Sequence, residues 1–301
     1  MNVVVICGAT ATGKSDLAVL LAKEIDAEVI NADSMQLYKG MDIGTAKITV
    51  EERQGIPHHL MDLLDVTEDA NVAWYQEKAR EKISEIHSRD KNAIIVGGTG
   101  LYIKAILDDL NFPDTDPVVR AALELEYATK GIGPLFERLE KLDPAAALAI
   151  DRANSRRVIR ALEVIKISGQ PFTANLPRKE STKYPNALQF GLVMDREILS
   201  DVISSRVDRM WEAGLVAEVE RLIESGITRG TTAQKALGYS QVIAFKEGKI
   251  SEEEAIDETK RATRQYARRQ ETWFSRDERI NWISPIQNRI ERILSSLNSE
   301  T

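Results

Sequence analysis

The sequence predicts an α/β fold: a P-loop-type parallel sheet with flanking helices, plus an inserted all-helical domain. An apolar run at residues 3–7 leads into a glycine-rich loop and then into a helical pattern at residues 16–23. Two more short runs typical of strands lie at residues 27–33 and 93–96. Strands that alternate with helices favour a parallel sheet. Residues 113–185 show only short helical patterns.

Composition limits the class of protein. A chain of 301 residues with 43% hydrophobic residues can form one large or two modest domains with a sizeable core. Because no apolar run approaches a membrane span and no basic region precedes the N-terminal run, we expect a cytoplasmic protein that does not bind membranes. The net charge of −7 argues against indiscriminate nucleic-acid binding but permits a local basic groove. We expect a monomer.

Cysteine and histidine give no sign of a disulfide framework or a zinc site. The only cysteine, Cys7, lies inside the first predicted strand, which indicates a packed thiol. His58, His59 and His87 lack both helical i, i+4 spacing and cysteine partners. We interpret them as surface or core histidines.

The glycine-rich loop is Gly8-Ala-Thr-Ala-Thr-Gly-Lys-Ser15. Between a strand and a helix, successive backbone N–H groups and the helix N-terminus converge on a phosphate. Lys14 supplies a positive charge, and the Ser15 hydroxyl suits Mg²⁺. The motif indicates a phosphate or diphosphate and does not specify ATP. The alternative is an accidental glycine-rich turn.

Asp33 follows the second predicted strand. The carboxyl ends of parallel strands share one edge of the sheet, so we expect Asp33 beside the phosphate loop. Residues 38–47 are polar and contain glycine, and they predict a loop near the same edge. The alternative for Asp33 is a helix N-cap or a turn.

The third strand follows a helical pattern at residues 72–87 and ends in Gly97-Gly-Thr-Gly100, before a helix at residues 101–107. Nucleotide-hydrolysing phosphate-loop proteins usually carry an Mg²⁺-binding aspartate at this point. Its absence argues against a motor or switch ATPase. Paired glycines permit a close backbone approach, either to a flat or bulky ligand or within a tight turn.

The helical domain is expected at residues 113–185, inserted into a core domain formed by residues 1–112 and 186–301. A breaker-rich segment at residues 112–117 marks its start, and a basic amphipathic helix at residues 154–166 lies within it.

After the insertion, residues 188–194 predict a strand, and residues 198–210 predict a helix with Arg206 and Arg209 on one face. Residues 232–241 are expected to form a short connector. The last predicted helix begins at a Ser-x-x-Glu capping box at Ser251 and runs to Phe274.

The last helix carries a cluster of basic residues with aromatic residues among them. The basic residues are Lys260, Arg261, Arg264, Arg268 and Arg269. Arginines bind RNA phosphates, and aromatic and guanidinium planes stack on unpaired bases. The alternative is a solvated helix whose arginines pair with acidic residues and whose aromatic residues belong to the core.

Taken together, these motifs resemble the tRNA dimethylallyltransferases, also called tRNA isopentenyltransferases. The matching stretches occur in the family's order and span nearly the whole chain: residues 8–15, 31–38, 41–47, 96–102, 157–163 and 262–273. The bacterial type fits better, because the zinc-finger extension of eukaryotic members has no counterpart after Trp282.

The resemblance implies transfer of a dimethylallyl group from dimethylallyl diphosphate to N6 of adenosine 37 of tRNA. The flipped adenine and the diphosphate are implied to enter a channel from opposite ends. The implied catalytic groups are Asp33 as general base with Lys14, Thr99 and Arg209. The implied diphosphate ligands are Gly8, Thr10, Thr12, Gly13, Lys14, Ser15 and Arg206, with Mg²⁺ at Ser15. Arg209 is preferred to Arg206 as the clamp on the diphosphate.

The resemblance also implies where tRNA binds. The positions are Asp33, Ser34, Met35, Gln36, Thr99, Arg157, Val158, Ile159, Arg160, Ala161, Arg264, Arg268 and Arg269. The helical insertion is implied to grip the anticodon stem.

Two other classes of protein suit part of the sequence. A small-molecule kinase that uses ATP would also have the loop and an aspartate after the second strand, but it would leave the arginine clusters without a role. An RNA-binding protein with a vestigial phosphate loop would bind tRNA without group transfer.

Overall fold

The computed structural model describes residues 1–175, 182–284 and 288–299. The chain divides into two compact units, an α/β unit of Met1–Leu107 with Tyr184–Thr301 and a helical unit of Asp108–Lys183. The sequence suggested residues 113–185 for the insertion, of which residues 176–181 lie outside the described residues.

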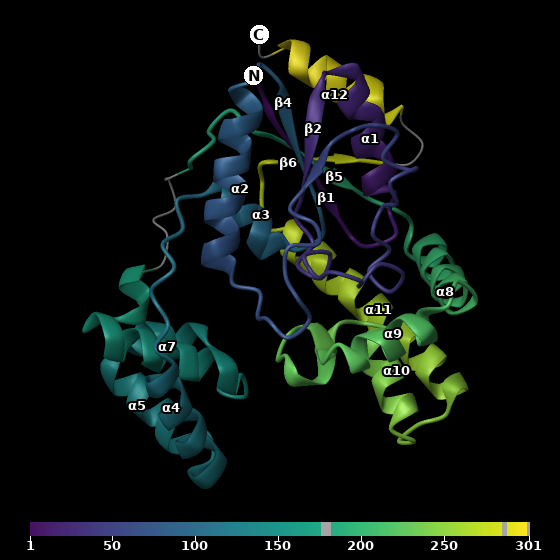
Figure 1. Ribbon diagram of the computed structural model, residues 1–301. Helices are drawn as coiled ribbons and strands as arrows, with labels where there is room; N and C mark the ends of the chain where they lie inside the picture. The colour runs from purple at the N-terminus through teal and green to yellow at the C-terminus, as the bar shows by residue number, and fades with distance from the viewer. Residues whose placement is uncertain (176–181, 285–287, 300–301) are drawn as a thin grey trace. The chain divides into compact units, whose positions relative to one another are not determined.

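Among the described residues, six parallel strands form the sheet of the α/β unit (Figure 1). They are β1 (Val3–Gly8), β2 (Ala27–Asn31), β3 (His58–His59), β4 (Asn92–Val96), β5 (Leu188–Leu192) and β6 (Ile280–Ile283). The strand order is β3-β2-β4-β1-β5-β6, so β1 is central and all of its residues are buried. The predicted parallel α/β fold is confirmed.

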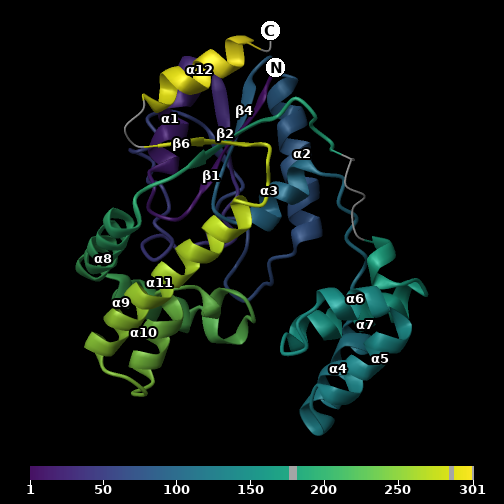
Figure 2. The same cartoon turned by 180° about the vertical axis from the view of Figure 1, so that it is seen from behind.

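Helices cover both faces of this sheet, as Figure 2 shows from behind. The helices α1 (Lys14–Glu24) and α12 (Arg289–Ser299) cover one face, and α2 (Val72–His87) and α3 (Gly100–Leu107) cover the other. The other helices of this unit are α8 (Arg196–Glu212), α9 (Leu215–Glu224), α10 (Tyr239–Lys246) and α11 (Glu252–Phe274), with the 3-10 turns η2 (Ile227–Arg229) and η3 (Ala233–Lys235). Val4 and Ile6 of β1 pack against α1 and α12, whereas Val5 and Cys7 face the core formed with α2 and α3. This alternation follows from the two-residue period of a strand.

Cys7 is a packed thiol, as its place in the first strand predicted. Its Sγ donates to the backbone oxygen of Phe190 at 3.5 Å. Burial raises the pKa of the thiol to about 12, so Cys7 stays protonated and unreactive at neutral pH.

Several elements were not predicted. The expected connector at residues 232–241 is wrong, because it holds η3 and the first turn of α10. The short helix α10 buries Tyr239, Val242 and Ile243, and its apolar residues give no clear one-sided pattern. The strand β3 has two residues, too few for a periodic signal. The helices α9 and α12 and the strand β6 also escaped prediction.

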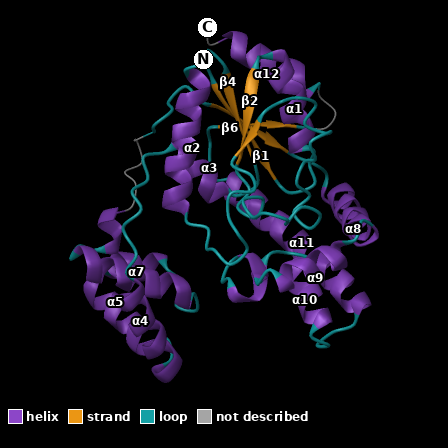
Figure 3. Cartoon of the chain, in the orientation of Figure 1, coloured by secondary structure: helices purple, strands orange, loops and turns teal. Residues whose placement is uncertain are grey.

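The described part of the helical unit has four α-helices and a 3-10 turn (Figure 3). They are α4 (Pro117–Lys130), α5 (Gly133–Leu142), α6 (Pro144–Ala149), α7 (Ser155–Ser168) and η1 (Phe172–Asn175). This unit has a core of its own, which includes Leu135, Leu139, Val158 and Leu162. The side chains of Asp116, Asp143 and Asn154 cap α4, α6 and α7.

The α/β unit is held together where the chain leaves it and returns to it. The backbone N–H of Tyr184 donates to the oxygen of Leu107 at 3.4 Å.

None of the helices in the described residues is both long and apolar enough to span a membrane.

Candidate active site

The phosphate loop joins β1 to α1, and two of its glycines are required by its shape. Gly8 has φ +129°, and a Cβ there would lie 2.8 Å from the backbone oxygen of Leu192. Gly13, directly before α1, has the left-handed φ of +82°. The Thr12 hydroxyl donates to the oxygen of Ala9 at 2.9 Å and closes the loop on itself.

Lys14 lies at the start of α1 with its charge over this loop. Its Nζ donates to the oxygen of Ala9 at 2.6 Å. Burial, together with the positive charge of the nearby Arg206, lowers the pKa of Lys14 to about 8, whereas Asp33 opposes both effects. Lys14 is therefore a cation whose charge depends on pH near neutrality.

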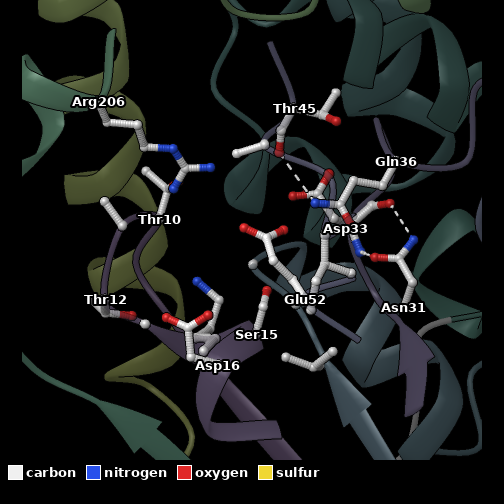
Figure 4. Close-up of a pocket in the computed structure, with 18 of the residues that line it drawn as sticks. Thr10, Thr12, Ser15, Asp16, Asn31, Asp33, Gln36, Thr45, Glu52 and Arg206 are labelled. Carbon is white, nitrogen blue, oxygen red and sulfur yellow. Dashed lines mark hydrogen bonds between the residues drawn. The ribbon is translucent and has the colours of Figure 1, made fainter. Parts of the chain in front are cut away.

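A cavity of about 300 Å³ opens over the loop. Figure 4 shows Thr10, Ser15 and Arg206 in this cavity together with Asp33 and Glu52. The expectation that Asp33 comes out beside the phosphate loop is therefore confirmed. Cations and N–H groups on one side of the cavity suit an anion.

Asp33 stabilises the turn after β2 and also lines the cavity. Its backbone N–H donates to Asn31 Oδ1 at 3.0 Å, and its Oδ1 accepts from the N–H of Met35 at 2.9 Å. Burial raises the pKa of Asp33, although the Met35 N–H and the positive charges of Lys14 and Arg206 oppose the rise. A carboxylate with a raised pKa is a stronger base than an exposed one.

Arg206 and Arg209 of α8 differ in their distance from the loop. Arg206 Nη1 donates to Thr10 Oγ1 at 3.5 Å, and this arginine is half-buried. Arg209 is exposed, and its Nε donates to the backbone oxygen of Ser205 at 3.2 Å. The resemblance favoured Arg209, but in the structure Arg206 is the one that reaches the loop. Spacing puts both on one face and could not separate them.

A second cavity, of about 420 Å³, adjoins the first. The two cavities share Thr10, Asp33, Thr45 and Arg206 as lining residues. Apolar side chains of the second cavity are Met35, Ile203, Val207, Met210, Ala236 and Leu237. A polar cavity over the phosphate loop therefore meets a largely apolar cavity where Asp33 and the other three shared residues lie.

The turn after β4 brings Thr99 to the second cavity. Thr99 Oγ1 accepts from the N–H of Ser34 at 3.2 Å. A Cβ on Gly98 would lie 2.1 Å from Gln270 Nε2, and one on Gly100 would lie 2.1 Å from the Trp273 ring. These two glycines thus allow side chains of α11 to pack closely on the turn, which is a use of the motif that neither interpretation anticipated.

The loop of residues 41–47 carries Thr45 to the junction of the two cavities, and buried polar side chains hold it. Glu218 of α9 accepts the N–H groups of Ile43 and Gly44 at 2.9 and 3.3 Å and the Tyr239 hydroxyl at 2.6 Å. Glu218 was not predicted from the sequence. The sequence feature that could have identified Glu218 is its place on the apolar face of an amphipathic helix.

Lys47 stabilises the other end of the same loop through hydrogen bonds and ion pairs. Its side chain is 4% exposed, and its Nζ contacts Asp42 at 2.7 Å, Asp62 at 2.5 Å and the oxygen of Tyr38 at 2.9 Å. Gln36 adds a bond from Nε2 to the oxygen of Thr45 at 3.2 Å. The position of Thr45 is therefore set from three sides.

Some residues of the basic cluster of α11 contact α8, and others are exposed to solvent. Lys260 pairs with Asp208 of α8 at 2.6 Å, and Arg264 Nη1 donates to Ser204 Oγ at 3.1 Å. These two residues join α11 to α8 and so contribute to packing.

Arg268 and Arg269 are exposed. Together with Trp273, whose residue is 44% exposed, they line an open surface pocket. The guanidinium of Arg269 also lies 5.7 Å from the ring centre of Tyr266. This part of α11 is available to a nucleic acid.

The residues expected to contact tRNA from α7 are placed unevenly. Three are buried in the core of the helical unit: Val158, Ile159 and Ala161. Arg160 donates to the buried Glu163 at 2.8 Å and to the oxygen of Pro113 at 2.6 Å. Arg157 is exposed. Side-chain contact with RNA is thus possible at Arg157, whereas the three apolar side chains stabilise the unit.

Comparisons with known proteins agree on one family. The family model described as IPP transferase matches residues 36–277. A tRNA dimethylallyltransferase from Thermobifida fusca is 55% identical over 287 residues, which cover 94% of this chain and 89% of that protein. The crystal structure of the tRNA isopentenylpyrophosphate transferase from Bacillus halodurans has a TM-score of 0.74 and 41% identity, covering 99% of this chain and 96% of that one. A eukaryotic dimethylallyltransferase acting on tRNA has a TM-score of 0.84 at 29% identity, covering 99% of this chain and 79% of that one.

Proposed function

Because this chain belongs to the IPP transferase family of tRNA dimethylallyltransferases, we propose that it transfers a dimethylallyl group from dimethylallyl diphosphate to N6 of adenosine 37 of tRNA. The products are N6-(dimethylallyl)adenosine in tRNA and free diphosphate. Membership in a family of prenyltransferases sets aside the kinase and the non-catalytic RNA-binding protein.

The observation that carries this proposal is the junction of the two cavities at Asp33. The phosphate-loop cavity suits the diphosphate, and the largely apolar cavity suits the flat adenine that comes from the tRNA. The reacting carbon and the N6 amine then meet beside a carboxylate. Such positioning lowers the barrier because the two reactants no longer have to find each other.

In the proposed reaction, N6 forms a bond to C1 of the dimethylallyl group while the bond from C1 to the diphosphate oxygen breaks. The electron pair leaves with the diphosphate, and Asp33 accepts the proton from N6. General-base help of this kind typically contributes about 10²–10⁴-fold. The remaining acceleration comes from positioning and from stabilisation of the leaving group.

The diphosphate is proposed to bind Arg206 and the phosphate loop. The loop residues in this set are Gly8, Thr10, Thr12, Gly13, Lys14 and Ser15. Their positive charges and N–H groups surround the place where negative charge grows in the transition state. We propose Arg206 as the clamp, because it contacts Thr10, and Arg209 as a more peripheral charge of the same cavity.

Mg²⁺ is proposed to accompany the diphosphate. In the described residues the Ser15 hydroxyl lines the cavity without a hydrogen-bond partner, and the carboxylates of Asp16 and Glu52 line the same cavity. Oxygen donors of this kind fit Mg²⁺, which binds proteins through few side chains and completes its shell with phosphate oxygens and water. The ion would supply further positive charge to the leaving diphosphate.

The tRNA is proposed to contact the ends of β2 and β4 through Ser34, Met35 and Thr99, and α11 through Arg268 and Arg269. The helical unit is proposed to hold the anticodon stem. Action as a monomer is part of this proposal. We place the activity in the cytoplasm, where tRNA is modified.

The proposal is tested by mixing the protein with unmodified tRNA, dimethylallyl diphosphate and Mg²⁺ and digesting the tRNA to nucleosides. Mass spectrometry is expected to find one five-carbon addition on adenosine, which disappears when adenosine 37 is replaced. An addition at another adenosine would contradict the assigned position. Absence of any addition, with tRNA still bound, would contradict the proposed reaction.

A further inference from the structure

A buried side chain of α11 bonds the backbone of two residues that line the phosphate cavity, one in the phosphate loop and one in the turn after β4. Gln270 Oε1 accepts from the backbone N–H of Thr10 at 2.9 Å. Its Nε2 donates to the backbone oxygen of Gly98 at 2.9 Å. The residue is 4% exposed, so both of its polar atoms are satisfied inside the protein.

The chemistry of these two contacts requires an amide. Thr10 offers a donor and Gly98 an acceptor, so the side chain between them must accept at one atom and donate at the other. An ionised glutamate of the same shape would place a negative oxygen against the Gly98 oxygen. A leucine would leave the part-buried Thr10 N–H and the buried Gly98 oxygen without this partner, which is costly.

The contact with Thr10 lies beside the groups proposed to hold the diphosphate. Thr10 lines both cavities, and its hydroxyl accepts from Arg206. Gly98 also lines the phosphate cavity. Because the Thr10 N–H is directed to Gln270, the amide orients this part of the loop, and the Thr10 side chain is then placed toward Arg206.

We propose that Gln270 is a positioning residue of the diphosphate site, which fixes the Thr10 segment of the phosphate loop to the turn after β4 before the diphosphate binds. This inference rests on the proposed function of that cavity as a diphosphate site. A loop that is already ordered loses less conformational entropy on binding, and the affinity is higher for that reason. Gln270 does not touch the reacting atoms.

The variant Gln270→Leu removes both hydrogen bonds and keeps the apolar part of the side chain. We expect the affinity for inorganic diphosphate in the presence of Mg²⁺, measured by calorimetry without tRNA, to fall about tenfold. In the transfer reaction, KM for dimethylallyl diphosphate rises by a similar factor, and KM for tRNA stays unchanged.

A matched control is Gln76→Leu. Gln76 of α2 donates from Nε2 to the backbone oxygen of Ala105 at 2.8 Å, away from both cavities. We expect this variant to lower Tm without changing either the affinity for diphosphate or the two KM values. A purely structural role of Gln270 would give the same pattern as this control and would overturn the inference.

A second variant, Gln270→Glu, keeps the shape and the acceptor for Thr10, so it provides an answer if the leucine variant does not fold. We expect diphosphate binding at least as weak as in the leucine variant, because the carboxylate opposes both the Gly98 oxygen and the diphosphate. Either folded variant with wild-type affinity for diphosphate contradicts the positioning role. A wild-type protein that binds no diphosphate and transfers no group instead contradicts the proposed function.

Discussion

The Asp33 carboxylate stabilises a backbone turn and is also the proposed general base. One of its oxygens accepts from the N–H of Met35, which fixes the turn after β2. The carboxylate also lies at the place where the two cavities meet. Its position beside the phosphate loop could be predicted from the parallel direction of the strands, because parallel strands end at one edge of the sheet.

The variant Asp33→Asn tests the role as a base. It keeps an acceptor for the Met35 N–H but cannot accept a proton, so we expect kcat to fall about 10²–10⁴-fold with tRNA binding retained. Steady-state kinetics and a tRNA binding assay measure the two effects. Asp69→Asn is the control, since Asp69 accepts from Thr231 and Thr232 and lines neither cavity. Undiminished kcat in the Asp33→Asn variant would remove Asp33 as the base.

The ionisation of Lys14 predicts an alkaline limit to activity. The pKa of Lys14 is lowered to about 8, so its positive charge is present below that pH and absent above it. The raised pKa of Asp33 sets the acidic limit, because the base must be ionised. We expect a bell-shaped pH profile of kcat/KM for dimethylallyl diphosphate, which reports the free enzyme.

Lys14→Arg separates the two limits, because arginine does not titrate in this range. We expect the alkaline limb of the kcat/KM profile to move to higher pH and the acidic limb to stay in place. A profile whose alkaline limb is unchanged would assign that limb to another group.

Helix α11 has two kinds of arginine that spacing could not distinguish. Arg264 bonds Ser204 of α8, whereas Arg268 and Arg269 are exposed. Only the packing of α11 against α8 decides which of them face solvent. In the same way, the long apolar strands could be predicted, but β3 could not, because two residues are too few for a periodic signal, and α10 could not, because its apolar residues follow no clear period.

Charge on the exposed part of α11 is expected to appear in the salt dependence of tRNA binding. Replacing Arg268 and Arg269 by glutamine should weaken binding and reduce the slope of log K against log salt by about 0.7 to 0.9 for each RNA phosphate that the variant no longer neutralises. Diphosphate affinity should not change. Arg261→Gln is the matched control, since Arg261 pairs with Glu258 at 2.6 Å. Equal slopes in the variant and the wild type would show that Arg268 and Arg269 do not bind RNA phosphates.

At the scale of the whole molecule, the sequence predicted an inserted helical domain but not how the chain closes behind it. Leu107 and Tyr184 are hydrogen-bonded to each other within the α/β unit. The helical unit has its own core. Those two facts come from long-range packing, which local patterns do not record.

Replacing residues 108–183 by a short glycine-serine linker tests the division of labour between the units. We expect the shortened protein to fold and to bind diphosphate like the wild type, because the phosphate cavity lies wholly in the α/β unit. The affinity for tRNA should fall about tenfold or more, because fewer RNA phosphates are then bound. Calorimetry and a gel-shift assay measure the two affinities. Wild-type tRNA affinity would show that the helical unit does not hold the stem.

The bond between Thr10 and Gln270 joins positions 260 residues apart in the chain. During synthesis on the ribosome, the phosphate loop emerges among the first segments and α11 among the last. The helical unit is a continuous segment and can form its core while translation continues. A nascent or prematurely terminated chain that lacks α11 therefore lacks a finished diphosphate site, so catalytic competence arises only near the end of translation.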